Sequence, residues 1–461
     1  MGICGTAMTS LAGILKERGC RVTGSDQNVY PPMSHLLESL GIPVSHGYGA
    51  RNLHPPPDLV VVGNVITARN PEALELERLR IPYLSLPQAL AAFAMEGKRS
   101  LVISGTHGKT TTSSAAAWIL ERAGLDPGFM IGGIPLNFGR NFKMGRGPHF
   151  VVEGDEYDTA FFDKGPKFLH YNPWVVILTG IEFDHADIYR DLDQIRENFR
   201  KLVRLVPSDG LLIANADDVE VMALAGEAAC PIRTYGLKAG AQWSARYETT
   251  PHGMTAIHVQ QDGRSLQPLA TPLFGRHNVS NLLSCVVLGD FLGMEEAQVR
   301  EAFRQFRGVK RRQEVLGEAG GVMIVDDFAH HPTAVQETIR AFVERFPDRR
   351  LVAVFEPRSN SSRRNVFQDR YAQSFDGAHG VMIPEPPMME KIPPHERFSS
   401  SRLVKDLRVR GLEASYFKST DLLLQALIST VRPGDLVLIM SNGDFQDLPR
   451  RLLKALSREA A

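Results

Sequence analysis

The feature that most limits the fold is a glycine-rich segment between an apolar run and a helical run. The segment follows residues 101–104 and precedes a helix-like stretch that ends before Gly124. A strand that leads through such a loop into a helix points the free N–H groups of the helix N-terminus at an anion. We therefore expect seven residues to hold the phosphates of a nucleotide: Gly105, Thr106, His107, Gly108, Lys109, Thr110 and Thr111.

Two side chains of this loop have more specific expected roles. Lys109 is expected to reach the β- and γ-phosphate oxygens, and the Thr110 hydroxyl to contact Mg²⁺. The loop is a shorter form of the common pattern, because Ile103 stands where that pattern has its first glycine. The alternative is a turn that only caps a helix.

Acidic and histidine side chains follow two later apolar runs. Glu153 comes directly after residues 150–152, and His185 lies shortly after residues 174–178. The carboxyl ends of parallel strands lie at one edge of a sheet, where ligands bind. We therefore expect Thr110, Glu153 and His185 to surround a metal ion, either Mg²⁺ or, because a histidine is included, Mn²⁺. The alternative is solvated loop acids and a capping histidine.

Short apolar runs alternate with helix-like stretches along the whole chain of 461 residues. This alternation predicts parallel sheets with helices on both faces, and the length suggests three domains. Changes in the pattern of apolar runs and helix-like stretches place the domains at 1–97, 98–306 and 307–461. We expect a Rossmann-like first domain, a central ATPase-like domain with a parallel sheet, and a Rossmann-like α/β third domain. Residues 247–267 are expected to form a hairpin that turns at Asp262-Gly263.

Composition excludes several classes of protein. Lys and Arg number 52, as do Asp and Glu, so the chain has no overall field that would attract a polyanion. No run reaches the ~18 apolar residues of a membrane span. There is no signal-peptide pattern, and the four cysteines form no C-x-x-C pair. We expect a cytoplasmic protein that binds neither nucleic acid nor membrane.

Other motifs give weaker signals. Gly2 and Gly5 precede a helix, and Asp26 ends a strand, a pattern that suggests either a nucleotide diphosphate or an ordinary helix start. Asp327 lies where a strand-like run ends and a helix-like run begins. At that position it would cap the helix, bind metal or bind ribose and phosphate. Near a triphosphate, Arg312 would stabilise the transferring phosphoryl group; in a linker it would be solvated.

The order of these motifs resembles that of the Mur ligase superfamily, ATP-dependent amide-forming ligases of peptidoglycan synthesis. The resemblance covers essentially the whole chain, through residues 105–111, 153–158, 182–185, 275–278, 309–312 and 326–332. Residues 2–6, 28–33, 356–360 and 440–443 resemble the branch that recycles L-alanyl-γ-D-glutamyl-meso-diaminopimelate onto UDP-N-acetylmuramate.

The resemblance implies that the three domains bind UDP-N-acetylmuramate, ATP and the tripeptide in chain order. It implies an acyl-phosphate intermediate, with His277, Asn278 and Asn281 flanking the adenine and with Asp327 reaching the nucleotide. The implied catalytic residues are Lys109, Glu153, His185 and Arg312. The residues expected to bind the UDP-sugar are Gly2, Gly5, Thr6 and Asp26.

The third domain is expected to select the tripeptide. Arg358 lies just past the strand-like residues 351–355, and its planar guanidinium suits a diaminopimelate carboxylate. Ser359, Asn360 and Asn442 would add neutral hydrogen bonds. The alternative is that Arg358 is a solvated residue or an internal ion-pair partner.

The chain departs from the family pattern in two places. Some members carry a carbamylated lysine in the helix after the Asp-His motif, where this chain has Phe199, with Lys201 offset by two, so no carbamylation is expected. The family's first strand precedes the glycine pair, whereas here that pair begins at residue 2. A strand of ~5–6 residues is therefore expected to be missing, through a truncation or a misassigned start.

Three other functions compete with this interpretation. The nearest is the UDP-N-acetylmuramate–L-alanine ligase, which has the same chemistry and a smaller amine. A nucleotide-binding regulatory or transport ATPase would form no amide product. A NAD oxidoreductase is disfavoured because the first domain has no full G-x-G-x-x-G. We expect the protein to be a monomer.

Overall fold

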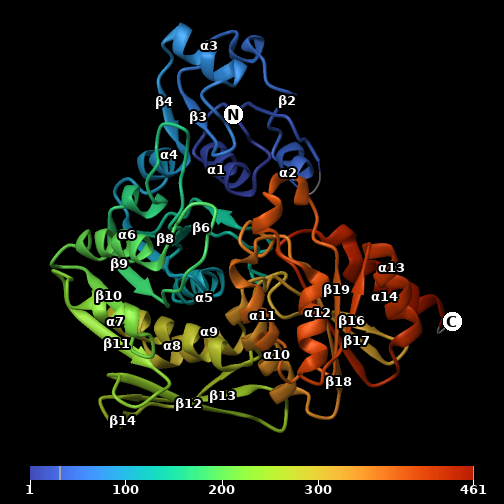
Figure 1. Cartoon of the computed structure of the whole chain (residues 1–461). Helices are drawn as coiled ribbons and strands as arrows, with labels where there is room; N and C mark the ends of the chain where they lie inside the picture. The colour runs from blue at the N-terminus through green and yellow to red at the C-terminus, as the bar shows by residue number, and fades with distance from the viewer. Residues whose placement is uncertain (31–32, 460–461) are drawn as a thin grey trace.

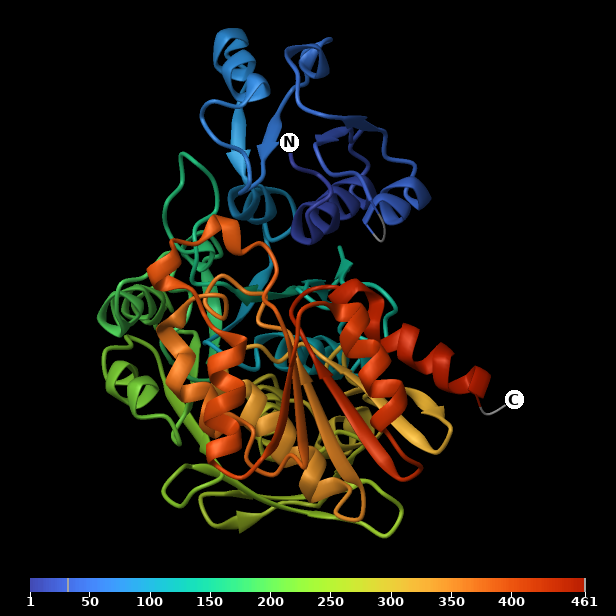
Figure 2. The ribbon, with the colours of Figure 1, turned by 45° about the vertical axis from the view of Figure 1, so that its right-hand side comes forward.

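The computed structural model describes residues 1–30 and 33–459 and divides into three α/β parts. The first part lies above the other two, and the central part lies beside the third (Figure 1). Figure 2 gives the same arrangement from a second direction. The predicted fold class, three α/β domains with a parallel central sheet, is confirmed. Pro31 and Pro32, within the 28–33 motif, lie outside the described residues.

The central sheet has eleven strands in the order β14-β13-β12-β11-β10-β9-β5-β8-β6-β7, with β15 beside β13. From β12 to β6 the neighbouring strands are parallel. The strands are β5 Arg99–Ser104, β6 Gly128–Met130, β7 Phe142–Lys143, β8 His149–Gly154, β9 Pro173–Leu178, β10 Leu211–Asn215, β11 Ile232–Gly236, β12 Trp243–Thr249, β13 Thr255–Gln261, β14 Arg264–Ser265 and β15 Leu269–Thr271.

The two faces of this sheet are covered by different helices, because alternate residues of each strand point to opposite faces. Leu101 and Ile103 of β5 pack with α5, α8 and α9, whereas Val102 packs with α6, α7 and the first domain's α1 and α4. The central helices are α5 Lys109–Arg122, α6 Leu192–Arg204, α7 Val219–Ala225, α8 Arg276–Phe291 and α9 Glu296–Arg304. The central sheet therefore anchors the first domain through a shared core.

The first domain contains two separate parallel pairs, β1–β2 and β3–β4, rather than the single sheet that the sequence suggests. Residues 1–3 run between the pairs: the Gly2 N–H donates to the Ser25 carbonyl, and the Gly63 N–H donates to the Met1 carbonyl. The elements are α1 Thr6–Glu17, β1 Gly24–Asp26, α2 Met33–Ser39, β2 Val44–His46, β3 Val60–Val62, α3 Pro71–Leu79, β4 Tyr83–Ser85 and α4 Leu86–Phe93.

The third domain is a six-stranded sheet in the order β16-β17-β21-β18-β19-β20, parallel except for β16. Leu351, Ala353 and Phe355 of β18 face α10–α12, whereas Val352 and Val354 face α13 and α14. The elements are β16 Glu314–Ala319, β17 Val322–Asp327, α10 Pro332–Arg345, β18 Arg350–Phe355, α11 Gln368–Ser374, β19 Gly380–Pro384, α12 Ser400–Val409, β20 Glu413–Phe417, α13 Thr420–Thr430, β21 Asp435–Met440 and α14 Leu448–Glu459.

The predicted hairpin differs from the one observed. Its long strands, β12 and β13, are joined at residues 250–254, and Asp262-Gly263 instead turns β13 into the short β14. A two-residue Asp-Gly turn favours a tight hairpin, but it does not say which of two adjacent turns joins the longer strands. Single-turn 3₁₀ helices complete the fold: η1 Ala50–Leu53, η2 Lys167–His170, η3 Asn365–Phe367, η4 Met389–Lys391, η5 Pro394–Glu396 and η6 Phe445–Asp447.

Within the described ranges, every helix is too short or too polar to serve as a membrane span.

Candidate active site

The glycine-rich loop joins β5 to α5, and its conformation requires both glycines. Gly105 has φ +130° and Gly108 has φ +83°, in the left-handed region that side chains disfavour. A Cβ atom on Gly108 would lie 2.4 Å from Asn281 Oδ1, and one on Gly105 would lie 2.3 Å from Thr179 Oγ1. The loop is therefore packed tightly against α8 and the end of β9, with Lys109 as the first residue of α5.

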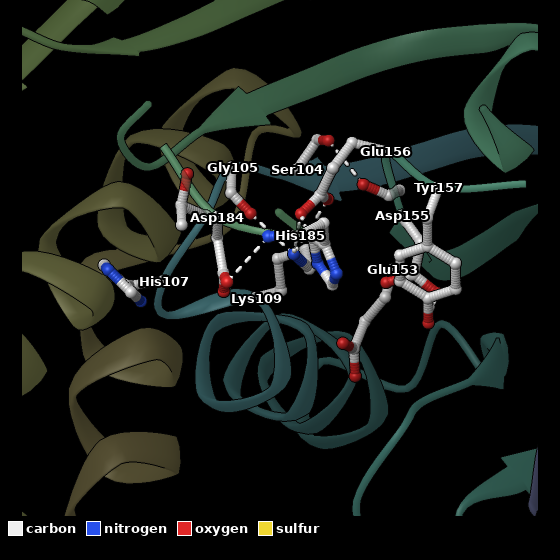
Figure 3. Close-up of polar contacts among 12 residues, drawn as sticks. Ser104, Gly105, His107, Lys109, Glu153, Asp155, Glu156, Tyr157, Asp184 and His185 are labelled. Atoms are coloured by element: carbon white, nitrogen blue, oxygen red, sulfur yellow. Dashed lines mark hydrogen bonds and ion pairs between the residues drawn. The ribbon is translucent and has the colours of Figure 1, made fainter. Parts of the chain in front are cut away.

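Lys109 lies in a buried polar cluster (Figure 3). Its Nζ donates to the Gly105 carbonyl at 2.6 Å and lies 3.0 Å from Glu156 Oε2. Burial opposes the charged form, but the Glu156 and Asp155 carboxylates outweigh it and raise the pKa of Lys109 above its ordinary value. Lys109 is thus a buried cation in the first turn of α5. A cation beside the N-terminus of a helix favours the binding of an anionic ligand.

Thr110 and Glu153 meet at the predicted metal position. The Thr110 hydroxyl donates to Glu153 Oε2 at 3.1 Å, and the Gly132 N–H donates to Glu153 Oε1 at 2.6 Å. Burial and the nearby Asp155 raise the pKa of Glu153. A hydroxyl and a buried carboxylate beside a phosphate loop are oxygen donors of the kind that Mg²⁺ takes, so the residues present fit that ion.

His185 reaches the same cluster from the loop after β9. Its Nε2 lies 3.2 Å from Glu156 Oε1, and its backbone N–H donates to Asp184 Oδ1 at 2.7 Å. Burial lowers the pKa of His185, but the Glu156 and Asp184 carboxylates raise it above the ordinary value. The backbone at His185 is left-handed, with φ +54°. Glu156 is therefore the common partner of the lysine and the histidine.

The first turn of α8 supplies His277, Asn278 and Asn281. His277 Nδ1 is buried and has no hydrogen-bond partner among the described residues. Burial, with a contribution from Arg312, lowers the pKa of His277 to about 4, so the ring is neutral near pH 7. The Asn278 amide donates to Gln313 Oε1 at 2.8 Å. His277, Asn278 and Asn281 all line the cavity, so a ligand bound there would contact the first turn of α8.

Arg312 and Asp327 approach from the third domain. The Arg312 guanidinium lies over the Phe328 ring, with its Cζ 4.4 Å from the ring centre. Burial lowers the pKa of Arg312. The Asp327 carboxylate accepts the backbone N–H groups of Gln313 and Ala329, each at 2.7 Å. Arg312 is thus a buried cation near the Asp327 and Glu153 carboxylates, whose charges oppose the effect of burial on its pKa, and Asp327 also shapes the backbone around it.

These residues line one cavity of about 690 Å³. Its walls come from all three domains: Thr6 of the first, the phosphate loop, His185 and His277 of the centre, and Arg312 of the third. The predicted residues that line it are Thr6, Thr106, His107, Gly108, Lys109, Thr110, Thr111, Glu153, His185, His277, Asn278, Asn281, Arg312 and Asp327. A volume of this size is typical of a small-molecule site.

The first domain's other predicted residues lie outside that cavity. Asp26 accepts the Cys4 N–H at 2.8 Å and the Asn28 N–H at 2.9 Å, so it organises the glycine-rich turn. Gly2 has φ +74°, and Gly5 precedes α1 as its N-cap.

The four residues predicted to bind the tripeptide also lie outside the cavity, and most contact other parts of the protein. Arg358 Nη1 lies 3.0 Å from Asp444 Oδ1, the internal ion pair that was the alternative. The Asn360 amide donates to Asp187 Oδ2 at 2.7 Å, and the Ser359 hydroxyl donates to Ser362 Oγ at 2.8 Å. Asn442 Oδ1 is buried without a partner in the described chain. The roles assigned to these residues stay predictions.

Glu156 is the residue that the sequence analysis missed. It lies in the acidic patch that begins at Glu153, and no spacing rule distinguishes the two. Glu153 is still within β8, whereas Glu156 lies in the following loop, which folds back onto Lys109. By contrast, Phe199 is fully buried against Phe168, and the Lys201 amine donates to Asn198 Oδ1 at 3.4 Å.

Comparison with protein families places the whole chain in one family. Three family models match: "Mur ligase family, catalytic domain" at residues 1–98, "Mur ligase middle domain" at 103–289 and "Mur ligase, glutamate ligase domain" at 311–443.

Individual relatives match over the full length. The UDP-N-acetylmuramate--L-alanyl-gamma-D-glutamyl-meso-2,6-diaminoheptandioate ligase of Escherichia coli K12 is 40% identical, covering 100% of this chain and 98% of that protein. Among solved structures, a murein peptide ligase from Psychrobacter arcticus is 34% identical, with a TM-score of 0.74 and coverage of 100% and 98%. The UDP-N-acetylmuramate-alanine ligase of Thermotoga maritima is 25% identical, with a TM-score of 0.81 and coverage of 99% and 98%.

Proposed function

The chain belongs to the Mur ligase family of ATP-dependent ligases, and we propose that it joins L-alanyl-γ-D-glutamyl-meso-diaminopimelate to UDP-N-acetylmuramate. The 40% identity over the whole chain to a ligase with these named substrates supports the proposal. The reaction would return a cell-wall tripeptide to peptidoglycan synthesis. We further propose that the enzyme works in the cytoplasm as a monomer, without nucleic acid or membrane as a partner.

The chemistry explains why the family consumes ATP. An amine does not displace oxide from a carboxylate, so the lactyl carboxylate of UDP-N-acetylmuramate is first converted to an acyl phosphate. The α-amine of the tripeptide then attacks the acyl carbon, and phosphate leaves. The protein has to neutralise the charge of the transferring phosphoryl group and hold the reactants in line.

The cavity contains groups suited to both tasks. Lys109 of the central domain and Arg312 of the third domain are the cations that would stabilise the phosphoryl charge. Thr110, Glu153 and His185 would hold Mg²⁺, which supplies further charge neutralisation when bound; we propose that Mn²⁺ can replace it because an imidazole is among the ligands. His277, Asn278 and Asn281 would bind the adenine.

The other two substrates are proposed to enter from the flanking domains. Gly2, Gly5, Thr6 and Asp26 would bind the UDP-sugar, and Thr6 already lines the cavity. Arg358 would bind a diaminopimelate carboxylate, with Ser359, Asn360 and Asn442 nearby. Its ion pair with Asp444 does not oppose this role, because the Asp444 side chain is 76% exposed and a substrate carboxylate can replace it.

One observation carries the proposal: residues of all three domains line a single cavity around the phosphate loop. The direct experiment is incubation with ATP, Mg²⁺, UDP-N-acetylmuramate and each candidate amine, followed by mass spectrometry. We expect the tripeptide conjugate together with ADP and phosphate. ATP hydrolysis without any conjugate would favour a regulatory ATPase and contradict the proposal.

The UDP-N-acetylmuramate–L-alanine ligase activity is the second candidate. The higher TM-score with the Thermotoga maritima alanine ligase, 0.81 against 0.74, favours it. A competition assay with tripeptide and L-alanine at equal concentration separates the two, and we expect the tripeptide product to dominate.

A further inference from the structure

The loop that carries His185 is held by the third domain at nearly every residue. Thr333 Oγ1 donates to Glu182 Oε2 at 2.7 Å, and His331 Nε2 donates to the Phe183 carbonyl at 3.2 Å. Further contacts come from the segment after β18. Ser361 Oγ donates to Asp184 Oδ1 at 2.7 Å, the Ala186 N–H donates to Ser361 Oγ at 3.3 Å, and Asn360 Nδ2 donates to Asp187 Oδ2 at 2.7 Å.

His185 is the exception within residues 182–187. Its imidazole is directed to Glu156 of the central domain, among the residues around Lys109 (Figure 3). Its left-handed backbone, φ +54°, is uncommon for a residue other than glycine and persists only where the surroundings hold it. The conformation of this histidine is therefore set by contacts made to its neighbours.

Ser361 makes the contacts closest to the histidine on both sides. Its hydroxyl donates to the residue before His185 and accepts the N–H of the residue after it. The same Asp184 oxygen that receives the serine proton also accepts the backbone N–H of His185 at 2.7 Å. Ser361 and Asp184 are 4% and 8% exposed, so water does not substitute for either partner.

We propose that Ser361 is a positioning residue: docking of the third domain on the central domain fixes the turn at 184–186 and thereby sets His185 at the metal site. The proposal deepens the proposed function, on which it rests. The third domain would then act on the metal site through the loop of His185, in addition to the Arg312 side chain that it contributes to the cavity. Metal binding, and with it formation of the reactive acyl phosphate, would then require the third domain to be in place.

The test measures metal binding rather than ligation. The affinity of the full-length protein for Mn²⁺ in the presence of ADP is measured from the electron paramagnetic resonance of free Mn²⁺. Ser361→Ala should weaken it about 10-fold, the low end for a lost hydrogen bond to a charged group. The affinity for ADP without metal and the thermal midpoint should stay near those of the wild type.

Ser362→Ala is the matched control. Ser362 is as buried as Ser361, but its hydroxyl donates to the Ser359 carbonyl within the third domain. We expect its Mn²⁺ affinity to match that of the wild type. Unchanged Mn²⁺ affinity in Ser361→Ala, or an equal loss in both variants, would overturn the proposal.

A second variant covers a failure of Ser361→Ala to fold. Thr333→Val keeps the shape of the side chain and removes the donor to Glu182 at the start of the same loop. It should weaken Mn²⁺ binding about threefold, within the range of one hydrogen bond, and an unchanged affinity would overturn the proposal. Neither measurement involves the UDP-sugar or the amine, so an error in the proposed substrates would leave both readouts intact.

Discussion

Two loops that follow parallel strands use their side chains in opposite ways. The phosphate loop after β5 turns Lys109, Thr110 and its glycine backbone toward the cavity. The segment after β18 engages its side chains elsewhere in the protein, with Arg358 on Asp444, Asn360 on Asp187 and Ser361 on Asp184. Both lie at the carboxyl end of a strand, where a ligand site is expected.

The difference comes from what each loop needs in order to form. The phosphate loop takes its shape from two glycines with positive φ and from its own helix, all within a few residues, and distant residues such as Thr179 then pack against it. The segment after β18 depends on partners more than 80 residues away in sequence. Position at a strand end therefore identifies a candidate site, but only the tertiary contacts show whether its side chains face a ligand or another domain.

Lys109→Ala should have the largest effect. Loss of a preorganised cation at the transferring phosphoryl group costs ~2.7–4 kcal/mol, so the ligation rate should fall roughly 10²–10³-fold or more. Lys143→Ala is the control, because Lys143 pairs with Glu121 and Asp126 outside the cavity. Steady-state ligation rates check this, and near-normal turnover in Lys109→Ala would contradict the phosphate-loop assignment.

Arg358→Ala tests whether the segment after β18 binds a ligand at all. A charge-assisted hydrogen bond contributes ~1.5–3 kcal/mol, so the tripeptide KM should rise roughly 10–150-fold. The KM values for ATP and UDP-N-acetylmuramate should barely change, because the other domains are proposed to bind them. A constant tripeptide KM, or an equal rise in all three, means that Arg358 is not the anchor.

Glu156→Gln should raise the affinity for ADP and lower the turnover number. The neutral amide leaves the Lys109 charge free for phosphate, so ADP should bind about 10-fold more tightly, as expected when one buried charge-assisted contact no longer competes. The turnover number should fall, since His185 loses its carboxylate partner. Calorimetric ADP binding and initial rates measure both.

Glu121→Gln provides the reference for that change, because Glu121 pairs with Lys143 away from the cavity. It should alter neither quantity. Weaker ADP binding in Glu156→Gln would show that Glu156 supports the nucleotide site rather than competing for its lysine.

Asp444→Asn should have the smallest effect. Its ion pair with Arg358 is largely exposed on the aspartate side, and such pairs contribute little, so the tripeptide KM should change by less than about twofold. A rise equal to that of Arg358→Ala would instead assign Arg358 to an internal contact. The pair of variants thus distinguishes a ligand-binding arginine from a structural one.

Local sequence signals were sufficient to predict the class of fold and the family. Alternating apolar runs predicted the three α/β units, and the ordered motifs predicted the Mur ligase family, which the family models confirm. These signals are local: a strand, a glycine pair and a helix are specified by neighbouring residues, whose backbone preferences do not need the rest of the chain.

The partners within the site became evident only from the packing of the folded chain. Glu156 and Glu153 look equivalent in the sequence, yet only Glu156 contacts both Lys109 and His185. Nothing in the sequence distinguishes Ser361 from Ser359, but of the two only Ser361 contacts the loop of His185. The physical reason is that hydrogen bonds and ion pairs act over about 3–4 Å, and which side chains come that close is fixed only when three separately specified domains pack together.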